Sequence, residues 1–348
     1  MNSTFAPRIV TFGEIMLRLS TPGFSRILQS QSFDVTYGGG EANVAASLAQ
    51  FGLDAAFVSK VPGNELGSAA LGHLRRFGVD TSGMARGGDR LGLYFLETGA
   101  SQRSSKVVYD RAGSAVTTIT PDDLDLDAIF AGATWFHFTG ITPALGDSAQ
   151  RTLAAMLERA RLAGATVSCD LNFRKKLWTT EEAQRVMTPL MEDVDVCIAN
   201  EEDADKSLGM AAAGTDVASG ELNEQGYADL AQRLRDRFGF KAVAITLRES
   251  ISASRNLWSA MLLDDRDCTV PTRSRIYDVT LIDRVGGGDS FAAGLIYGLV
   301  SLPTSRDALE FAVAASCIKQ TIPGDFNVTT VDEVMKLAGG DGSGRVER

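Results

Sequence analysis

Three consecutive glycines followed by an aspartate, Gly286, Gly287, Gly288 and Asp289, form the segment with the clearest chemical potential. We expect a helix to begin near Asp289, so the glycine N–H groups can point into one concavity at the positive end of the helix dipole. Such an arrangement stabilises the charge that develops on a phosphoryl group during its transfer. Asp289 would lie beside that anion and could accept a proton from an attacking hydroxyl. Taken alone, the segment fits a tight turn and an N-cap aspartate equally well.

A second glycine-rich segment, Gly38-Gly39-Gly40-Glu41-Ala42-Asn43, also stands at the start of a predicted helix. Its glycines would let a ligand approach the backbone closely, and the Asn43 side chain could hydrogen-bond with sugar hydroxyls. A plain tight turn explains this segment as well. The dinucleotide-binding fingerprint is excluded, because Asn43 occupies the place of its last glycine. The sequence also contains neither a GxxxxGK[ST] motif nor a protein-kinase HRD loop, which excludes those two kinds of phosphate site.

The composition restricts the partners that the protein can recognise. The 348 residues carry a formal net charge of −10, and the sequence pI is about 4.9. No overall positive field favours nucleic acid or an anionic membrane surface, so we expect neither as a partner. An anionic substrate would need a local basic pocket, because the charge of the whole protein repels it.

The cysteines and the apolar segments favour a cytoplasmic location. The four cysteines are scattered, with no CxxC pair and no histidine at ligand spacing, so we interpret them as free thiols in a reducing compartment. The first residues lack the pattern of a signal peptide. The most apolar stretch, residues 291–302, is too short to span a bilayer.

Apolar strand-like runs alternate with amphipathic helical runs along most of the chain. The predicted strands are residues 9–12, 56–61, 135–139, 166–171, 194–199 and 242–247. The predicted helices between them include residues 41–51, 65–77, 148–163 and 226–238. Strands and helices that alternate in this way indicate βαβ units and a mostly parallel sheet covered on both faces.

Two stretches depart from this alternation. Residues 18–37 and 91–111 alternate apolar and polar side chains, which predicts short, half-buried strands in a small sheet that projects from the main domain. Residues 209–224 are rich in Ala, Gly and Ser and are predicted to form a loop. The glycine-rich tail from Gly339 is predicted to be disordered.

The two glycine-rich motifs, the second read as Asp283-Arg284-Val285-Gly286-Gly287-Gly288-Asp289, together resemble the signatures of the ribokinase-like (pfkB-type) carbohydrate kinases. The resemblance covers roughly residues 8–337 in order. It implies an α/β fold, a layered domain with a mostly parallel central sheet plus a small β-sheet lid that closes over the sugar. The implied division is residues 1–16, 38–90 and 112–338 for the α/β domain, 17–37 and 91–111 for the lid, and 339–348 for a disordered tail.

Within the family, the chain is most similar to kinases that phosphorylate 2-keto-3-deoxygluconate with ATP. The residues that carry this likeness are Tyr109-Asp110-Arg111-Ala112-Gly113-Ser114-Ala115, Thr139-Gly140-Ile141-Thr142-Pro143 and Asp170-Leu171-Asn172-Phe173-Arg174. The likeness implies that Tyr109 and Arg111 bind the substrate carboxylate and that Arg174 reaches both substrate and ATP phosphate. An arginine fork suits a carboxylate in an acidic protein. The implied substrate-binding residues are Gly39, Gly40, Asn43, Tyr94, Tyr109, Arg111, Ile141, Arg174 and Asp289.

The resemblance also implies a nucleotide site and two kinds of metal ion. The expected ATP-binding residues are Asn172, Arg174, Asn200, Thr246, Arg248, Glu249, Ser250 and Gly288, four of them in a loop after the strand 242–247. Mg²⁺ would be organised through water by Glu202 or Asp203, although Asp203 stands where the family has a glutamate. A monovalent cation such as K⁺ could bind near Asp283. Two further departures are Gly287 in place of a usual alanine and Arg284 in place of a usual threonine or proline.

Alternative functions remain open at the level of the sequence. A related kinase could act on 2-keto-3-deoxygalactonate, fructose or another ketose, because Arg111 favours an acid without deciding its stereochemistry. A non-catalytic sugar-binding regulatory protein is a different class, which the presence of Asp289 and the anion site argues against. The resemblance also implies a homo-oligomer that pairs through lid strands, since such strands have unpaired edges.

Overall fold

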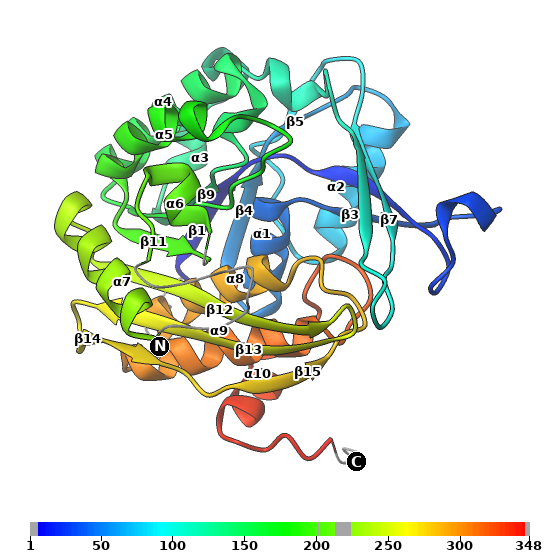
Figure 1. The fold of residues 1–348 in the computed structure, drawn as a ribbon. Coiled ribbons are helices and arrows are strands. Elements are labelled where there is room, and N and C mark those ends of the chain that lie inside the picture. Colours follow the sequence, from blue (N-terminus) through cyan, green and yellow to red (C-terminus); the bar gives the residue numbers. More distant parts are fainter. Residues whose placement is uncertain (1–5, 201, 213–223, 345–348) are drawn as a thin grey trace, which may run out of the picture.

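A nine-stranded sheet forms the centre of the computed structural model, which describes residues 6–200, 202–212 and 224–344 (Figure 1). Along the sheet the strands follow the order β14 (Cys268–Arg273), β13 (Arg255–Asp264), β12 (Ala242–Ser252), β11 (Val196–Ala199), β10 (Thr166–Asp170), β9 (Ala133–Thr139), β1 (Arg8–Phe12) and β4 (Asp54–Val58). The ninth strand, β15 (Tyr277–Thr280), pairs with β13 outside this path. The six strands from β12 to β4 are parallel to one another, which confirms the predicted mostly parallel sheet.

Helices cover both faces of the sheet, and this explains why its parallel strands are apolar runs. On one face, α1 (Gly40–Gln50), α8 (Gly287–Ser301), α9 (Ser305–Lys319) and α10 (Val331–Ala338) share a hydrophobic core with the sheet (Figure 1). On the other face, the core contains α3 (Leu126–Phe130), α4 (Asp147–Leu162), α5 (Thr180–Leu190), α6 (Asp203–Leu208) and α7 (Glu224–Phe238). Helix α2 (Glu65–Arg76) packs against α1 in a third cluster. The predicted layered α/β architecture is therefore confirmed.

The antiparallel end of the sheet corrects one prediction. Strand β12 does not end at residue 247 but continues to Ser252 and pairs with β13 as a long hairpin. The segment that contains Thr246, Arg248, Glu249 and Ser250 is thus a strand, and its assignment to a loop was wrong. The outer half of β12 is largely exposed, so its sequence lacks the continuous apolar run that marks the buried half.

A separate four-stranded sheet stands at the side of the main domain (Figure 1). Its order is β3 (Asp34–Gly38), β2 (Met16–Ser20), β7 (Gly92–Glu97) and β8 (Lys106–Asp110). Strands β2 and β7 are parallel, and the two outer pairs are antiparallel. Strands β7 and β8 lie within the predicted stretch 91–111, whereas β2 begins at Met16 and β3 ends at Gly38, just outside the predicted stretch 18–37. A two-stranded parallel sheet, β5 (Lys60–Val61) with β6 (Ala85–Arg86), completes the strands.

Two predicted irregular segments lie partly outside the described residues. In the predicted loop 209–224, Gly209 ends α6 in a left-handed conformation and α7 begins at Glu224, while residues 213–223 are not described. In the predicted tail, Gly339 and Gly340 donate backbone hydrogen bonds to the last turn of α10, and residues 345–348 are not described. No helix of the described part is long and apolar enough to cross a membrane.

Candidate active site

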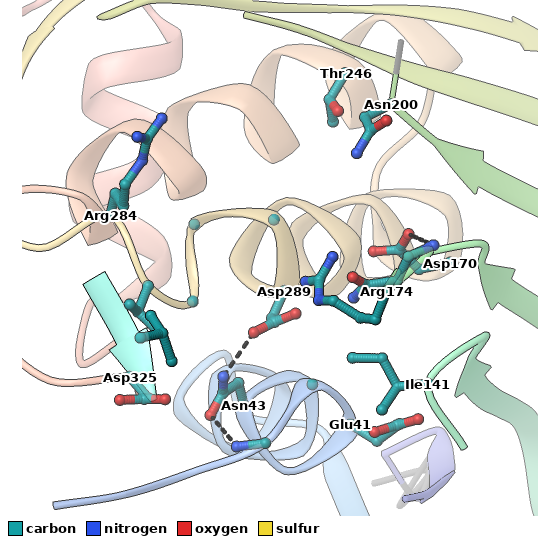
Figure 2. Close-up of a pocket in the computed structure, with 18 of the residues that line it drawn as sticks. Glu41, Asn43, Ile141, Asp170, Arg174, Asn200, Thr246, Arg284, Asp289 and Asp325 are labelled. Atoms are coloured by element: carbon teal, nitrogen blue, oxygen red, sulfur yellow. Dashed lines mark hydrogen bonds between the residues drawn. The ribbon is translucent and has the colours of Figure 1, made fainter. Parts of the chain in front are cut away.

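A cavity of about 330 Å³ opens at the carboxyl ends of the central parallel strands, between the four-stranded sheet and the first turn of α8 (Figure 2). In sheets of this kind, ligands bind outside the carboxyl ends of the strands. The cavity brings together most of the predicted site residues, namely Gly39, Gly40, Asn43, Tyr94, Tyr109, Arg111, Ile141, Asn172, Arg174, Asn200, Asp203, Thr246, Arg248, Gly286, Gly287, Gly288 and Asp289. The predicted residues Glu202, Glu249 and Ser250 do not line it.

The anion site is built by the turn that leads into α8. Gly286 has a φ of 82°, and a Cβ atom at this position would lie 2.1 Å from the carbonyl oxygen of Asp325, so only glycine fits. The Gly287 N–H donates a long hydrogen bond of 3.3 Å to the carbonyl of Arg284, so this amide partly serves the turn itself. Around a Cβ atom added at Gly288, the space is open for 4 Å. The unhindered approach to the helix N-terminus therefore lies at Gly288 and Asp289.

Asp289 is held by Asn43, which comes from the other glycine-rich motif (Figure 2). The Nδ2 atom of Asn43 donates to Oδ2 of Asp289 at 2.6 Å, and its Oδ1 accepts from the Gly39 N–H at 3.2 Å. Burial raises the pKa of Asp289 to about 6, although the hydrogen bond from Asn43 and the charge of Arg174 act in the opposite direction. A carboxylate with this pKa is suited to act as a general base near neutral pH. Asn43 therefore orients Asp289, and one amide hydrogen remains for a ligand.

The Glu41 carboxylate fixes the loop that carries Ile141 against the start of α1. Its Oε1 accepts from the backbone N–H of Thr139 at 2.9 Å, from the Thr139 hydroxyl at 2.8 Å and from the Thr142 hydroxyl at 2.6 Å. Burial raises the pKa of Glu41 to about 7, while these hydrogen bonds lower it. Glu41 is buried and Ile141 lines the cavity, so this hydrogen-bond network fixes the position of one wall of the site.

Arg111 is pre-positioned by a carboxylate that the sequence analysis missed. Its guanidinium forms an ion pair with Glu14, and the other oxygen of Glu14 accepts from the Ser114 hydroxyl at 2.6 Å. The Nε atom of Arg111 is buried and has no hydrogen-bond partner among the described residues. The ring of Tyr109 lies beside it, with its centroid 5.6 Å from Cζ of Arg111 and 5.8 Å from Nζ of Lys176. At this corner of the cavity, the Arg111 cation is paired with Glu14 and still has a buried Nε donor that a ligand could use.

Tyr94 lines the cavity, while its hydroxyl forms a hydrogen bond with a buried group of the protein. The hydroxyl donates to Asp325, a second buried carboxylate that the sequence analysis did not identify. Burial raises the pKa of Tyr94 well above its ordinary value, and the neighbouring Asp325 adds to this effect. Arg18 also donates to Asp325 at 2.6 Å, so this carboxylate joins two strands of the small sheet to the loop before α10.

The side of the cavity lined by the predicted ATP-binding residues contains a pair of buried acids. Burial raises the pKa of Asp170 well above its ordinary value, and the negative charges of Asp203 and Asp289 act in the same direction. Oδ1 of Asp203 accepts from the Phe173 N–H at 3.0 Å, and Oδ2 accepts from the Asn200 N–H at 3.3 Å. Asp203 thus holds two loops in place. Each loop carries a predicted ATP-binding residue, Asn172 or Asn200, that lines the cavity. Asp170 was quoted in a motif but had no assigned role.

One backbone feature also marks this side as a ligand site. Asn172 has a φ of 37°, a left-handed conformation that asparagine adopts more readily than most residues. A strained residue in a cavity wall is a frequent property of binding sites.

The described residues offer Mg²⁺ an acidic surface instead of a complete cage. No group of three or more His, Cys, Asp or Glu side chains in the described ranges is placed to hold a metal ion. Mg²⁺ usually keeps several waters and binds through one or two carboxylates together with substrate phosphates. Asp170 and Asp203 fit that requirement, because both line the cavity and a bound cation would favour the ionised form of Asp170, whose pKa is raised by burial.

Residues 6–329 match the family described as pfkB family carbohydrate kinase. The chain therefore belongs to the pfkB family of carbohydrate kinases. A solved structure from Thermotoga maritima, described as 2-dehydro-3-deoxygluconokinase, is 56% identical, with 96% of this chain and 99% of that chain covered and a TM-score of 0.92. This pfkB kinase is also similar to curated relatives. The 2-dehydro-3-deoxygalactonokinase of Haloferax volcanii is 33% identical over 96% of this chain and 97% of its own length. The 2-dehydro-3-deoxygluconokinase of Bacillus subtilis is 30% identical over 91% of each chain.

Family membership confirms the predicted resemblance, the fold and the enzyme class. The protein is an ATP-dependent sugar kinase, and the family implies that Mg²⁺ accompanies ATP. The catalytic and binding roles of individual residues remain predictions.

Proposed function

We propose that this pfkB kinase transfers the γ-phosphoryl group of ATP to a terminal hydroxyl of 2-keto-3-deoxygluconate, which is the same compound as 2-dehydro-3-deoxygluconate. The observation that carries the proposal is the placement of Arg111 in the same cavity as Asp289, with a buried Nε that has no described partner. An unpaired arginine donor in a buried corner suits a substrate carboxylate. The relatives from Thermotoga maritima and Bacillus subtilis bear the matching name.

In this mechanism, Asp289 accepts the proton of the attacking hydroxyl while Asn43 keeps its carboxylate aligned. The N–H groups at the start of α8, near Gly288, stabilise the charge on the transferring phosphoryl group. Arg174, which also lines the cavity and whose charge acts on Asp289, contacts the phosphate. Asp203, and Asp170 beside it, would hold Mg²⁺ through water, and the ion would neutralise charge on the ATP phosphates; Glu202, the other residue expected to do this, does not line the cavity.

The remaining predicted residues are assigned by their place around the cavity. Gly39, Gly40, Tyr94, Tyr109 and Ile141 contact the sugar acid in this proposal. Asn172, Asn200, Thr246 and Arg248 contact the nucleotide, whereas Glu249 and Ser250 lie farther out on the same hairpin.

We assign residues 17–37 and 91–111 the role of a lid that excludes water, which otherwise competes as the phosphoryl acceptor. These segments also expose apolar side chains, Val35 and Val108 on strands β3 and β8 and Phe24 and Leu28 in the connection between β2 and β3. A second copy of the chain that pairs through the lid strands would cover them. Sedimentation velocity at micromolar concentration tests this, and a purely monomeric protein would contradict it.

The four cysteines are free thiols, and ATP is made and used in the cytoplasm, so we place the enzyme there.

The resemblance also implied a monovalent cation beside Asp283. The ammonium group of Lys319 lies at that position and donates a hydrogen bond to the carbonyl oxygen of Asp283.

A coupled assay that follows ADP formation tests the substrate. We expect kcat/KM to be highest with 2-keto-3-deoxygluconate, lower with 2-keto-3-deoxygalactonate and much lower with fructose. The Haloferax volcanii relative makes the galactonate compound the second candidate. If the galactonate compound or a neutral ketose has the highest kcat/KM, the substrate assignment is wrong. If no sugar raises ADP formation above the rate with ATP alone, the non-catalytic alternative is favoured.

Gly288→Ala is expected to lower kcat by on the order of tenfold or more without loss of thermal stability. The added methyl group enters open space beside Asp289, where the phosphoryl group passes. Alanine favours a helix over glycine by up to about 1 kcal/mol, so the fold should not suffer. Gly72→Ala is the matched control, because Gly72 is also a helical glycine with open space around its added Cβ, but on the exposed surface of α2. Equal kcat values for the two variants would show that Gly288 has no part in transfer.

A further inference from the structure

Lys319, the last residue of α9, has a fully buried side chain, and none of the seven other lysines, all of them described, is buried in this way. Its Nζ atom donates to two backbone carbonyl oxygens, that of Asp283 at 3.3 Å and that of Ile322 at 3.2 Å. A buried lysine is costly unless its charge is compensated. The position of this ammonium group therefore has to be explained by the groups that surround it.

The two carbonyl groups belong to the segments that shape the anion site. Asp283 begins the turn that leads through Gly286 into α8, and Ile322 belongs to the loop that leads to Asp325. The backbone oxygen of Asp325 lies against Gly286, and Cε of Lys319 would lie 3.2 Å from a Cβ atom at Gly286. The lysine stem thus runs directly beneath the glycine turn and joins both segments.

The charges around Lys319 are already balanced. Arg18 donates to Asp283 and to Asp325 at 2.5 and 2.6 Å, so two cations face two carboxylates, all of them buried. Burial lowers the pKa of Lys319, whereas the charges of Asp283 and Asp325 oppose this effect. An additional monovalent cation would have to share the carbonyl oxygens with the ammonium group. It would also add a buried positive charge without a partner.

We propose that Lys319 takes the place of a monovalent cation in this kinase. Its ammonium group binds the carbonyl oxygens of Asp283 and Ile322 and holds the glycine turn so that the first N–H groups of α8 face the phosphoryl group. Lys319 is a positioning residue, since it does not line the cavity. The inference depends on kinase activity and not on which sugar acid is the substrate.

The first test compares the wild-type protein in K⁺ and in tetramethylammonium at equal ionic strength. We expect the same kcat, with the best sugar substrate, and the same melting temperature in both salts. Activation by K⁺ together with a K⁺-dependent rise in melting temperature would overturn the proposal. The melting measurement needs no substrate, so it gives a result even if the sugar assignment is wrong.

The second test uses Lys319→Ala, Lys319→Met and, as a control cavity far from the site, Met156→Ala in α4. Lys319→Met, which keeps the volume but loses the charge, should lower kcat about tenfold or more without rescue by K⁺. The kcat of Lys319→Ala should fall by a similar factor in tetramethylammonium. K⁺ should restore part of this kcat and raise the melting temperature of the variant by roughly 2–4 °C. Met156→Ala should lose stability with no response to K⁺. A folded Lys319→Met variant with wild-type kcat, or a Lys319→Ala variant indifferent to K⁺ in both measurements, would contradict the proposal.

Discussion

Asp289→Asn is expected to lower kcat by on the order of 10²–10⁴, the usual effect of removing a general base, while both KM values stay within a few-fold. The Asn variant keeps a side-chain oxygen that can accept the hydrogen bond from Asn43, so the geometry of the site should persist. Steady-state kinetics with the preferred sugar acid and ATP measure the effect. Near-normal turnover would show that Asp289 serves only to order the helix start.

The pH dependence provides a second measurement of the same assignment. Because burial raises the pKa of Asp289 to about 6, the wild-type kcat/KM should fall about tenfold per pH unit below that value, as the base becomes protonated. The folded state holds this proton more tightly than the unfolded state, so the contribution of Asp289 to stability declines between about pH 4 and pH 6 as the pH rises. Asp289→Asn should therefore be at least as stable as the wild type at pH 8. If its residual activity shows the same acid limb, the limb belongs to another group.

Local patterns were sufficient to predict the parallel half of the fold. Strands such as β1 and β10 are buried on both faces and therefore appear in the sequence as short apolar runs. The hairpin of β12 and β13 could not be predicted in this way. The outer half of β12 is largely exposed, and polar residues of it such as Arg248 pair with buried residues of β13 such as Trp258, so no apolar run in β12 marks the pairing.

The site was predictable where its chemistry resides in contiguous motifs. The glycines before Asp289 and Asn43 shape the backbone locally, and both motifs reach the same cavity. Glu14, Asp325 and Lys319 were not predicted, because their roles depend on partners that are distant in sequence. Glu14 lies 97 residues from Arg111, and Arg18 lies 307 residues from Asp325. A single acidic or basic residue in a sequence gives no indication of such a partner.

Arg111→Ala is expected to raise KM for the sugar acid about 10- to 150-fold and to leave KM for ATP nearly unchanged. A carboxylate bound in a buried corner would lose a charge-assisted hydrogen bond, which contributes roughly 1.5–3 kcal/mol. Arg111→Lys should restore only part of the affinity, because a point charge cannot reproduce the planar fork. The lysine variant also leaves Glu14 with a cationic partner, so it separates the loss of substrate binding from the cost of an unpaired buried carboxylate.

Arg90→Ala is the matched control for this prediction, because Arg90 forms an exposed ion pair with Asp110 beside Arg111. An exposed pair contributes little, so neither KM value should change by more than about twofold. The decisive comparison uses two substrates that differ only in the carboxylate, such as the sugar acid and its neutral ketose counterpart. The loss in kcat/KM on changing Arg111 to alanine should be large for the acid and small for the neutral sugar. If both losses are equal, or if the wild-type enzyme does not prefer the acid, Arg111 does not bind a carboxylate and the protein is a kinase of neutral ketoses.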